Sequence, residues 1–135
     1  MLLLGLKTRG EHIMEKGEMS QQLQDQMGRL QQLQNQLQVI QQQRAQVEQR
    51  LKEVEEALEE LENATDKTPI YKSVGSVLIK AKGKSDIVEE LTENKESLSL
   101  RQNSLNKQEG QTREKVNELQ SKVQNAMSMS SGANA

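Results

Sequence analysis

The sequence lacks cysteine, phenylalanine and tryptophan, and it holds one tyrosine and one proline in 135 residues. Without cysteine there is no disulfide, no thiolate metal site and no cysteine nucleophile, and the redox compartment stays undetermined. Hydrophobic residues make up 33% of the chain and aromatic residues 1%, which is too little apolar volume to fill a globular interior. A long coiled coil reconciles this composition with a folded chain, because its apolar residues are confined to one seam.

The sequence also lacks the features of nucleic-acid-binding and membrane proteins. A net charge of −2 provides no basic footprint for nucleic acid, and the scarcity of aromatic residues leaves no platform for base stacking. No apolar run approaches the roughly 18 residues that span a bilayer. The apolar residues 1–6 are fewer than a secretory signal needs, and no basic region precedes them. We therefore expect a cytoplasmic protein that binds neither nucleic acid nor membrane.

Motifs that form catalytic, phosphate-binding or metal-binding sites in other proteins are absent, and the residue types that build such sites are isolated. There is no glycine-rich phosphate loop, no metal-spaced set of histidines and no Ser/His/Asp trio, and His12 stands alone. The glutamates of residues 55–62 are typical of a solvated helix face with partners such as Arg50 and Lys52. We predict no enzymatic activity, no catalytic residue, no metal site and no cofactor. Two interpretations of the lysines at positions 80, 82 and 84 stay open: protection of a strand edge, or docking to an acidic partner.

Two long segments carry heptad repeats, whose a and d positions form an apolar seam. The first predicts a helix over residues 19–64 with Ser20 as its N-cap, ending before Pro69, which disfavours helix at the preceding residue. The second, less regular repeat predicts a helix over residues 85–128 capped by Ser85, with a frayed end at residues 131–135. The a and d positions of the first helix are Leu23, Gln26, Leu30, Leu33, Leu37, Ile40, Arg44, Val47, Leu51, Val54, Leu58 and Leu61. Those of the second are Val88, Leu91, Lys95, Leu98, Gln102, Leu105, Glu109, Thr112, Val116, Leu119, Val123 and Ala126.

Between the two repeats, residues 70–81 predict a short β-hairpin. Gly75-Ser76 suits a two-residue type II′ turn, which needs a positive φ at its first central position. An isolated hairpin is marginal in water, and this one has apolar side chains on both faces and open strand edges. We therefore expect the hairpin to pair with hairpins of other chains. The predicted oligomerisation residues are Ile70, Tyr71, Val74, Val77, Leu78 and Ile79.

A chain that folds back at the hairpin brings the two helices together in antiparallel orientation. The two heptad frames then interlock without adjustment, from Leu61 opposite Val88 to Leu23 opposite Ala126. The middle layers are polar, and Arg44 and Glu109 occupy adjacent layers, where they either form an ion pair or extend outward into solvent. We expect the arms to bend or open near mid-length, where Gly110 adds a helix-weakening residue.

The ends of the two helices meet at the end of the arms far from the hairpin, and they are rich in methionine. One interpretation is a surface for variable apolar partners, since methionine is flexible and polarizable; the other is a seam end that frays. Residues 1–18 show no periodicity, so we expect a disordered N-terminal extension, with translation starting further in at Met14 or Met19. The predicted binding residues at the arm ends are Met19, Leu23, Met27, Leu30, Val123, Ala126, Met127 and Met129.

Two local strings carry a family resemblance: VEQRLKEVEEALEEL at residues 47–61 and, more specifically, IYKSVGSVLIK at residues 70–80. With the order helix, single hairpin, helix, the chain resembles the β-type subunits of archaeal prefoldin over residues 19–130; residues 1–18 do not match the family pattern. The resemblance implies a mainly α fold, a long antiparallel two-helix coiled coil whose hairpin assembles into an intermolecular β-barrel.

The same resemblance implies a function. Two α and four β subunits would form a hexamer whose arm ends hold unfolded polypeptides, without ATP, for delivery to a group II chaperonin. By position, the client-contacting residues would come from the arm-end set named above. The alternative is a structural or tethering coiled coil, which shares the heptads but does not need the hairpin.

Overall fold

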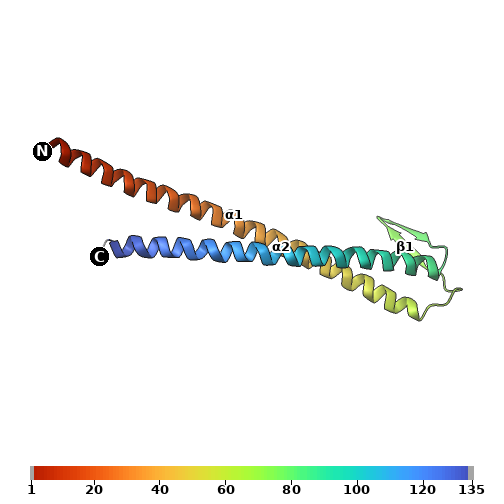
Figure 1. The fold of residues 1–135 in the computed structure, drawn as a ribbon. Coiled ribbons are helices and arrows are strands. Elements are labelled where there is room, and N and C mark those ends of the chain that lie inside the picture. Colours follow the sequence, from red (N-terminus) through yellow and green to blue (C-terminus); the bar gives the residue numbers. More distant parts are fainter. Residues whose placement is uncertain (1, 134–135) are drawn as a thin grey trace. The chain divides into compact units, whose positions relative to one another are not determined.

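The computed structural model describes the backbone of residues 2–133 and the side chains of residues 21–129. The chain runs through helix α1 (Leu2–Glu62), strands β1 (Tyr71–Val74) and β2 (Val77–Lys80), and helix α2 (Lys84–Ala133), as Figure 1 shows along the colour gradient. The fold is mainly helical with one two-stranded antiparallel sheet, which confirms the predicted two long helices and hairpin; assembly of the hairpin into a barrel stays a prediction. Within the described residues, neither helix has a stretch long and apolar enough to cross a membrane.

The boundaries of α1 differ from the predicted helix of residues 19–64. The helix ends at Glu62, where Asn63 N and Ala64 N donate to the carbonyl oxygens three residues earlier and close the last turn. It begins at Leu2, since no proline stands before the heptads to stop it. The side chains of residues 1–20 lie outside the described part, so the assignment of residues 1–18 as an extension outside the working protein stays a prediction.

The start of α2 corrects the predicted cap. Ile87 N donates to the carbonyl oxygen of Gly83 at 3.4 Å, which makes Gly83, and not Ser85, the residue whose carbonyl accepts the first helical bond. Glycine is tolerated there because it adopts the non-helical backbone angles of a cap at little cost. The helix continues to Ala133, past the predicted end at residue 128, and residues 134–135 of the predicted frayed end lie outside the described part.

The hairpin follows the sequence prediction closely. Tyr71 pairs with Lys80 and Val74 with Val77, which leaves Gly75-Ser76 as a two-residue turn. Gly75 has a φ of 61°, and no other described residue, Ser76 included, has a positive φ. One positive φ at the first central position is the signature of a type II′ turn. Ala81 N donates to the Ile70 carbonyl at 2.8 Å and extends the pairing to residues 70–81.

The molecule divides into two compact units. Residues 40–108 form the hairpin unit, which contains both strands, and residues 1–39 with 109–135 form the arm-end unit. The division falls among the polar layers that the heptads predicted to be weak. Bending of the arms at that point stays a prediction.

In the hairpin unit, the predicted seam is shielded from solvent. Val47 and Leu105 are 5% and 4% exposed, and the other a and d positions of the unit are half-buried. Lys95, placed opposite Val54 by the heptad register, forms an ion pair with the neighbouring Glu55 at 3.9 Å. This contact joins the two helices next to the predicted layer of Val54 and Lys95.

In the arm-end unit, α1 and α2 also lie together. Gln26 and Leu33 of α1 line one cavity of about 310 Å³ with Leu119 and Lys122 of α2. Val116 and Val123 are buried, and the remaining described a and d positions are half-buried, except Glu109, which is buried. Because a two-helix seam offers each side chain only one opposing helix, most seam residues gain only part of the roughly 1.5–3 kcal/mol that full burial of an aliphatic side chain contributes.

Candidate functional site

The hairpin presents a cluster of exposed apolar side chains, which we call the hairpin surface: Ile70, Tyr71, Val74, Val77, Leu78 and Ile79. All are exposed except Ile70, which is half-buried, and Leu78 is 71% exposed. The observed strand register places Tyr71 and Leu78 on one face and Val74, Val77 and Ile79 on the other, as the sequence alternation predicted. Such a set is unusual on an isolated surface and is typical of an interaction site.

One polar contact ties the hairpin to α2, and a second joins the segments of the chain that enter and leave the hairpin. Lys72 of β1 donates to the carboxylate of Glu90 on α2 and forms an ion pair with it. Lys84 Nζ donates to the carbonyl oxygen of Ala64 at 2.9 Å, beyond the end of α1. α1 has no basic residue in its own last turn, so Lys84 supplies a cation close to the negative end of that helix. The hairpin is thus fixed at its base, while its apolar faces stay open.

An apolar groove of about 420 Å³ adjoins the hairpin base. Side chains from both helices line it together with Ile70 and Tyr71 of the hairpin surface. Two of its residues, Ala57 and Ile87, were not predicted as functional, because both precede a heptad a position and so lie beside the seam. Their signal in the sequence is a widening of the apolar stripe on both helices next to the hairpin.

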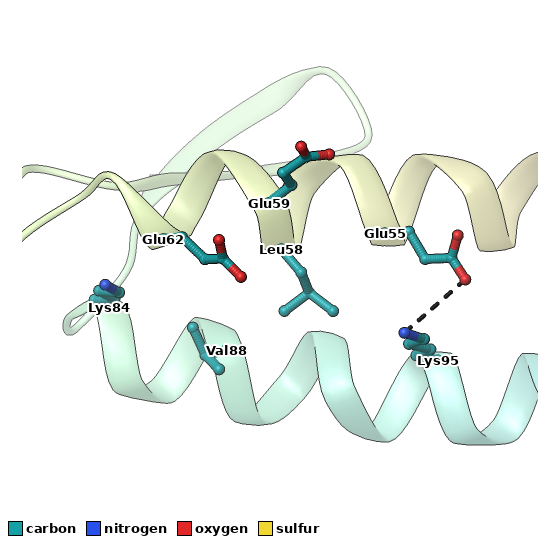
Figure 2. Close-up of a pocket in the computed structure, with 7 residues that line it drawn as sticks. All are labelled: Glu55, Leu58, Glu59, Glu62, Lys84, Val88 and Lys95. Carbon is teal, nitrogen blue, oxygen red and sulfur yellow. Dashed lines mark ion pairs between the residues drawn. The ribbon is translucent and has the colours of Figure 1, made fainter.

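The glutamates of α1 near the hairpin are exposed to solvent. One of them, Glu55, forms an ion pair with the other helix, which the sequence did not predict. Figure 2 shows Glu55 and Glu62 of α1 directed toward α2, on which Lys84 and Lys95 lie, with Leu58 and Val88 between them, and Glu59 directed away from α2. Glu55 forms its ion pair with Lys95, on the other arm, rather than with Arg50 or Lys52. Both side chains of this pair are about half exposed, so the pair contributes at most ~1 kcal/mol. Within the described residues, no group of three or more metal-ligating side chains comes together.

The arm-end residues separate into two classes. Leu23, Leu30 and Ala126 are half-buried and Val123 is 6% exposed, so these four pack in the seam. Met27, Met127 and Met129 are exposed, and Met129 is 71% exposed. Met19 lies outside the residues whose side chains are described. These three methionines lie outside the predicted a and d positions, and their exposure agrees with a place beside the seam.

Arg44 and Glu109, the charged residues at seam positions, each have a partner on their own helix. Arg44 Nε lies 3.6 Å from the Glu48 carboxylate. Glu109 is 5% exposed, and its carboxylate accepts a hydrogen bond from Arg113 Nη2 at 2.8 Å. These contacts reduce the cost of placing a charged group in the seam, since a buried charge requires a partner. A direct pairing of Arg44 with Glu109 stays a prediction.

Comparison with known proteins points to one family. The family model described as Prefoldin subunit matches residues 24–129. The prefoldin subunit beta of Archaeoglobus fulgidus is 48% identical over 67 residues, which are 50% of this chain and 57% of that protein. The prefoldin subunit beta of Pyrococcus furiosus is 43% identical over 63 residues, 47% of this chain and 53% of that protein. The aligned stretch thus spans little more than half the length of these relatives.

Solved structures extend the likeness to most of the chain. The crystal structure of the prefoldin beta subunit from Thermococcus strain KS-1 matches with a TM-score of 0.68 and 39% identity, over 78% of this chain and 91% of that one. The prefoldin beta2 subunit of the same strain matches with a TM-score of 0.60 over 67% of this chain and 95% of that one. At 23% identity, the second match supports the fold alone.

Proposed function

Because the chain belongs to the prefoldin subunit family, whose model matches residues 24–129, we propose that it is a subunit of a cytoplasmic hetero-oligomeric chaperone that holds unfolded polypeptides without ATP. Its partners are an α-type prefoldin subunit and further copies of the chain itself, in the ratio of two α to four β. The complex passes its clients to a group II chaperonin.

The observation that carries this proposal is the hairpin surface. A tethering coiled coil needs the heptad seam but gains nothing from an apolar hairpin between its arms, and five exposed apolar side chains in water are a liability unless something covers them. Strand pairing between copies satisfies the open edges and covers both faces, as in a closed barrel. We therefore assign the hairpin surface to assembly.

Client binding is assigned to the exposed methionines of the arm-end unit, Met27, Met127 and Met129, together with Met19 and the seam residues Leu23, Leu30, Val123 and Ala126. Methionine side chains adapt their shape to different apolar partners, which suits a protein that must hold many sequences. A frayed seam end also exposes methionine, so this assignment needs a functional test.

Sedimentation and aggregation assays separate the chaperone from the tethering protein. We expect the chain, mixed with its α-type partner, to sediment as a hexamer and to suppress aggregation of a chemically unfolded test protein without ATP. A monomer or dimer that leaves aggregation unchanged would support the tethering alternative.

Trimming the arm ends separates assembly from client capture. A variant that starts at Leu30 and ends at Leu119 retains the hairpin unit, so we expect it to form the same oligomer and to lose most of its suppression of aggregation. If the trimmed chain no longer forms the oligomer, the assembly site has been misplaced.

A further inference from the structure

The apolar groove beside the hairpin is open in the described structure. Its apolar lining comes from Ala57 and Leu61 of α1, Ile87 and Leu91 of α2, and Ile70 and Tyr71 of the hairpin surface. None of these side chains is fully buried. A groove of about 420 Å³ accommodates one or two aliphatic side chains of another segment.

The hairpin of the same chain does not fill the groove. Tyr71 lines the groove. Leu78 lies on the same sheet face as Tyr71, because it pairs with Ser73, which is two residues from Tyr71 along β1 and therefore on the same face. Leu78 is not among the lining residues and is 71% exposed. The most exposed large apolar side chain of the hairpin thus shares a sheet face with Tyr71, whereas Lys72 lines the groove from the other face.

The charges of the two surfaces are complementary. The polar lining of the groove comprises Glu60, Asn94 and the ion pair of Lys72 with Glu90. Residues 53–62 of α1, which include Glu60, carry six glutamates and no cation. Lys80 shares the sheet face of Leu78, is exposed, and forms no ion pair within the described part of the chain. The hairpin therefore combines the apolar side chain of Leu78 with the cation of Lys80, and the groove combines an apolar lining with the carboxylate of Glu60.

We propose that this groove receives the hairpin of a second copy of the chain, with Leu78 of one copy against Ala57 and Ile87 of the other, and Lys80 facing Glu60. The inference rests on the proposed assembly through hairpins and adds a docking site on the helices to strand pairing. It also gives Lys80, the last residue of β2, an acidic partner. In a two-fold pair each contact occurs twice, so its effect on assembly is doubled.

Crosslinking between two differently labelled copies tests the contact directly. The chain has no cysteine, so Ala57→Cys and Leu78→Cys place one thiol on each of two full-length preparations. We expect a bis-maleimide reagent to yield a crosslinked dimer when the two are mixed, alone or with the α-type partner. The matched control replaces Ala57→Cys with Ala45→Cys, an exposed alanine of the same helix, and should yield none above background. An assembled complex without the Ala57–Leu78 product would overturn the proposal.

Charge reversal tests the polar half of the contact and distinguishes contacts within one copy from contacts between copies. Glu60→Lys and Lys80→Glu should each weaken assembly by about fivefold per contact, because a favourable exposed pair becomes a repulsive one. When the two variants are mixed, the reversed groove of one copy meets the reversed hairpin of the other, and the unaltered groove meets the unaltered hairpin. Both contacts then join opposite charges, so we expect wild-type assembly. A mixture no stronger than either variant alone would overturn the contact between copies.

Aggregation suppression measured on the same samples separates this inference from the proposed function. If the chain suppresses aggregation and assembles but neither the crosslink nor the mixed rescue appears, the groove contact fails and the chaperone assignment stands. If no oligomer forms with or without the α-type partner, the assembly proposal and the groove contact fail together.

Discussion

The two units of this molecule expose apolar residues of different kinds. In the hairpin unit five of the six lie on two short strands that a turn joins in one defined register, and three of these five are β-branched. In the arm-end unit they are chiefly methionines on helix faces. Branched side chains on a paired strand have few rotamers and suit one fixed partner, whereas methionine has three rotatable bonds and fits many. The difference is what we expect if the hairpin unit mediates assembly and the arm-end unit mediates variable contacts, as proposed above.

The polar surfaces of the two units also differ, in their content of charged residues. Residues 21–39 of α1 carry nine glutamines and two charged residues, while residues 40–62 carry ten charged residues. Charges specify partners and register by attraction and repulsion, and uncharged amides do neither strongly. Under the proposed function, a charged hairpin unit suits recognition of related subunits, and a glutamine-rich arm-end unit suits contact with many sequences.

The largest expected effect is the loss of assembly when the hairpin surface is charged. Val74 is 49% exposed and Val39, on α1, is 51% exposed, so they form a matched pair. Val74→Asp should dissociate the complex, because it places a carboxylate in the surface that other chains cover, and Val39→Asp should not. Native mass spectrometry of both variants with the α-type partner checks this, with circular dichroism to verify that both stay helical. Equal dissociation by both would remove the distinction between the units.

The next effect concerns the arm ends. Replacing Met27, Met127 and Met129 by glutamine should weaken capture of unfolded test proteins by ~tenfold, since each exposed methionine loses apolar area that a client covers. Assembly should not change. Leu100, an exposed leucine of the hairpin unit, is the control: Leu100→Gln removes apolar surface of comparable exposure and should leave capture unaltered.

Seam stability depends on burial rather than on residue type. Leu105 is 4% exposed and Leu100 is 71% exposed on the same helix. Leu105→Ala should lower the free energy of unfolding by about 2–5 kcal/mol through the cavity it leaves, whereas Leu100→Ala should change it by less than ~0.5 kcal/mol. Urea unfolding of the assembled protein measures both. Comparable losses would mean that the two arms pack in another register.

Replacement by alanine should change the stability of the protein in opposite directions at two glycines. At Gly75 the φ of 61° is unfavourable for an L residue, so Gly75→Ala should destabilise the hairpin by about 1–2 kcal/mol. At Gly110 no atom lies within 4 Å of an added Cβ, so Gly110→Ala should stabilise α2 by about 1 kcal/mol. Thermal unfolding followed by circular dichroism measures both changes. A neutral Gly75→Ala would contradict the type II′ turn.

The smallest expected effect is that of the exposed ion pair between Glu55 and Lys95. Glu55→Gln should reduce the free energy of unfolding by at most ~1 kcal/mol, with the difference vanishing at high salt. Glu56→Gln, which alters a neighbouring exposed carboxylate, is the control and should have no effect. A loss at Glu55 that persists in high salt would indicate a contact stronger than an exposed pair.

Most of the fold follows from periodicity. Every described a and d position predicted from the heptads is buried or half-buried, including polar ones such as Gln26 and Lys95. The turn at Gly75-Ser76 and the alternation of hairpin faces also follow from residue type, because one needs a positive φ and the other a period of two. The N-cap of α2 was predicted at Ser85 but lies at Gly83. Both glycine and serine are accepted as N-cap residues, so only the backbone geometry distinguishes the two positions.

The sequence alone determined the order of the elements, the seam, the antiparallel register and the apolar character of the hairpin, because these depend on short-range periodicity and turn chemistry. The tertiary structure decided what depends on which segments come together. It attached the hairpin to α2 through Lys72 and Glu90, brought Lys84 to the end of α1, and opened the groove that Ala57 and Ile87 share with Tyr71. These residues lie far apart in the chain, and no repeat in the sequence relates them.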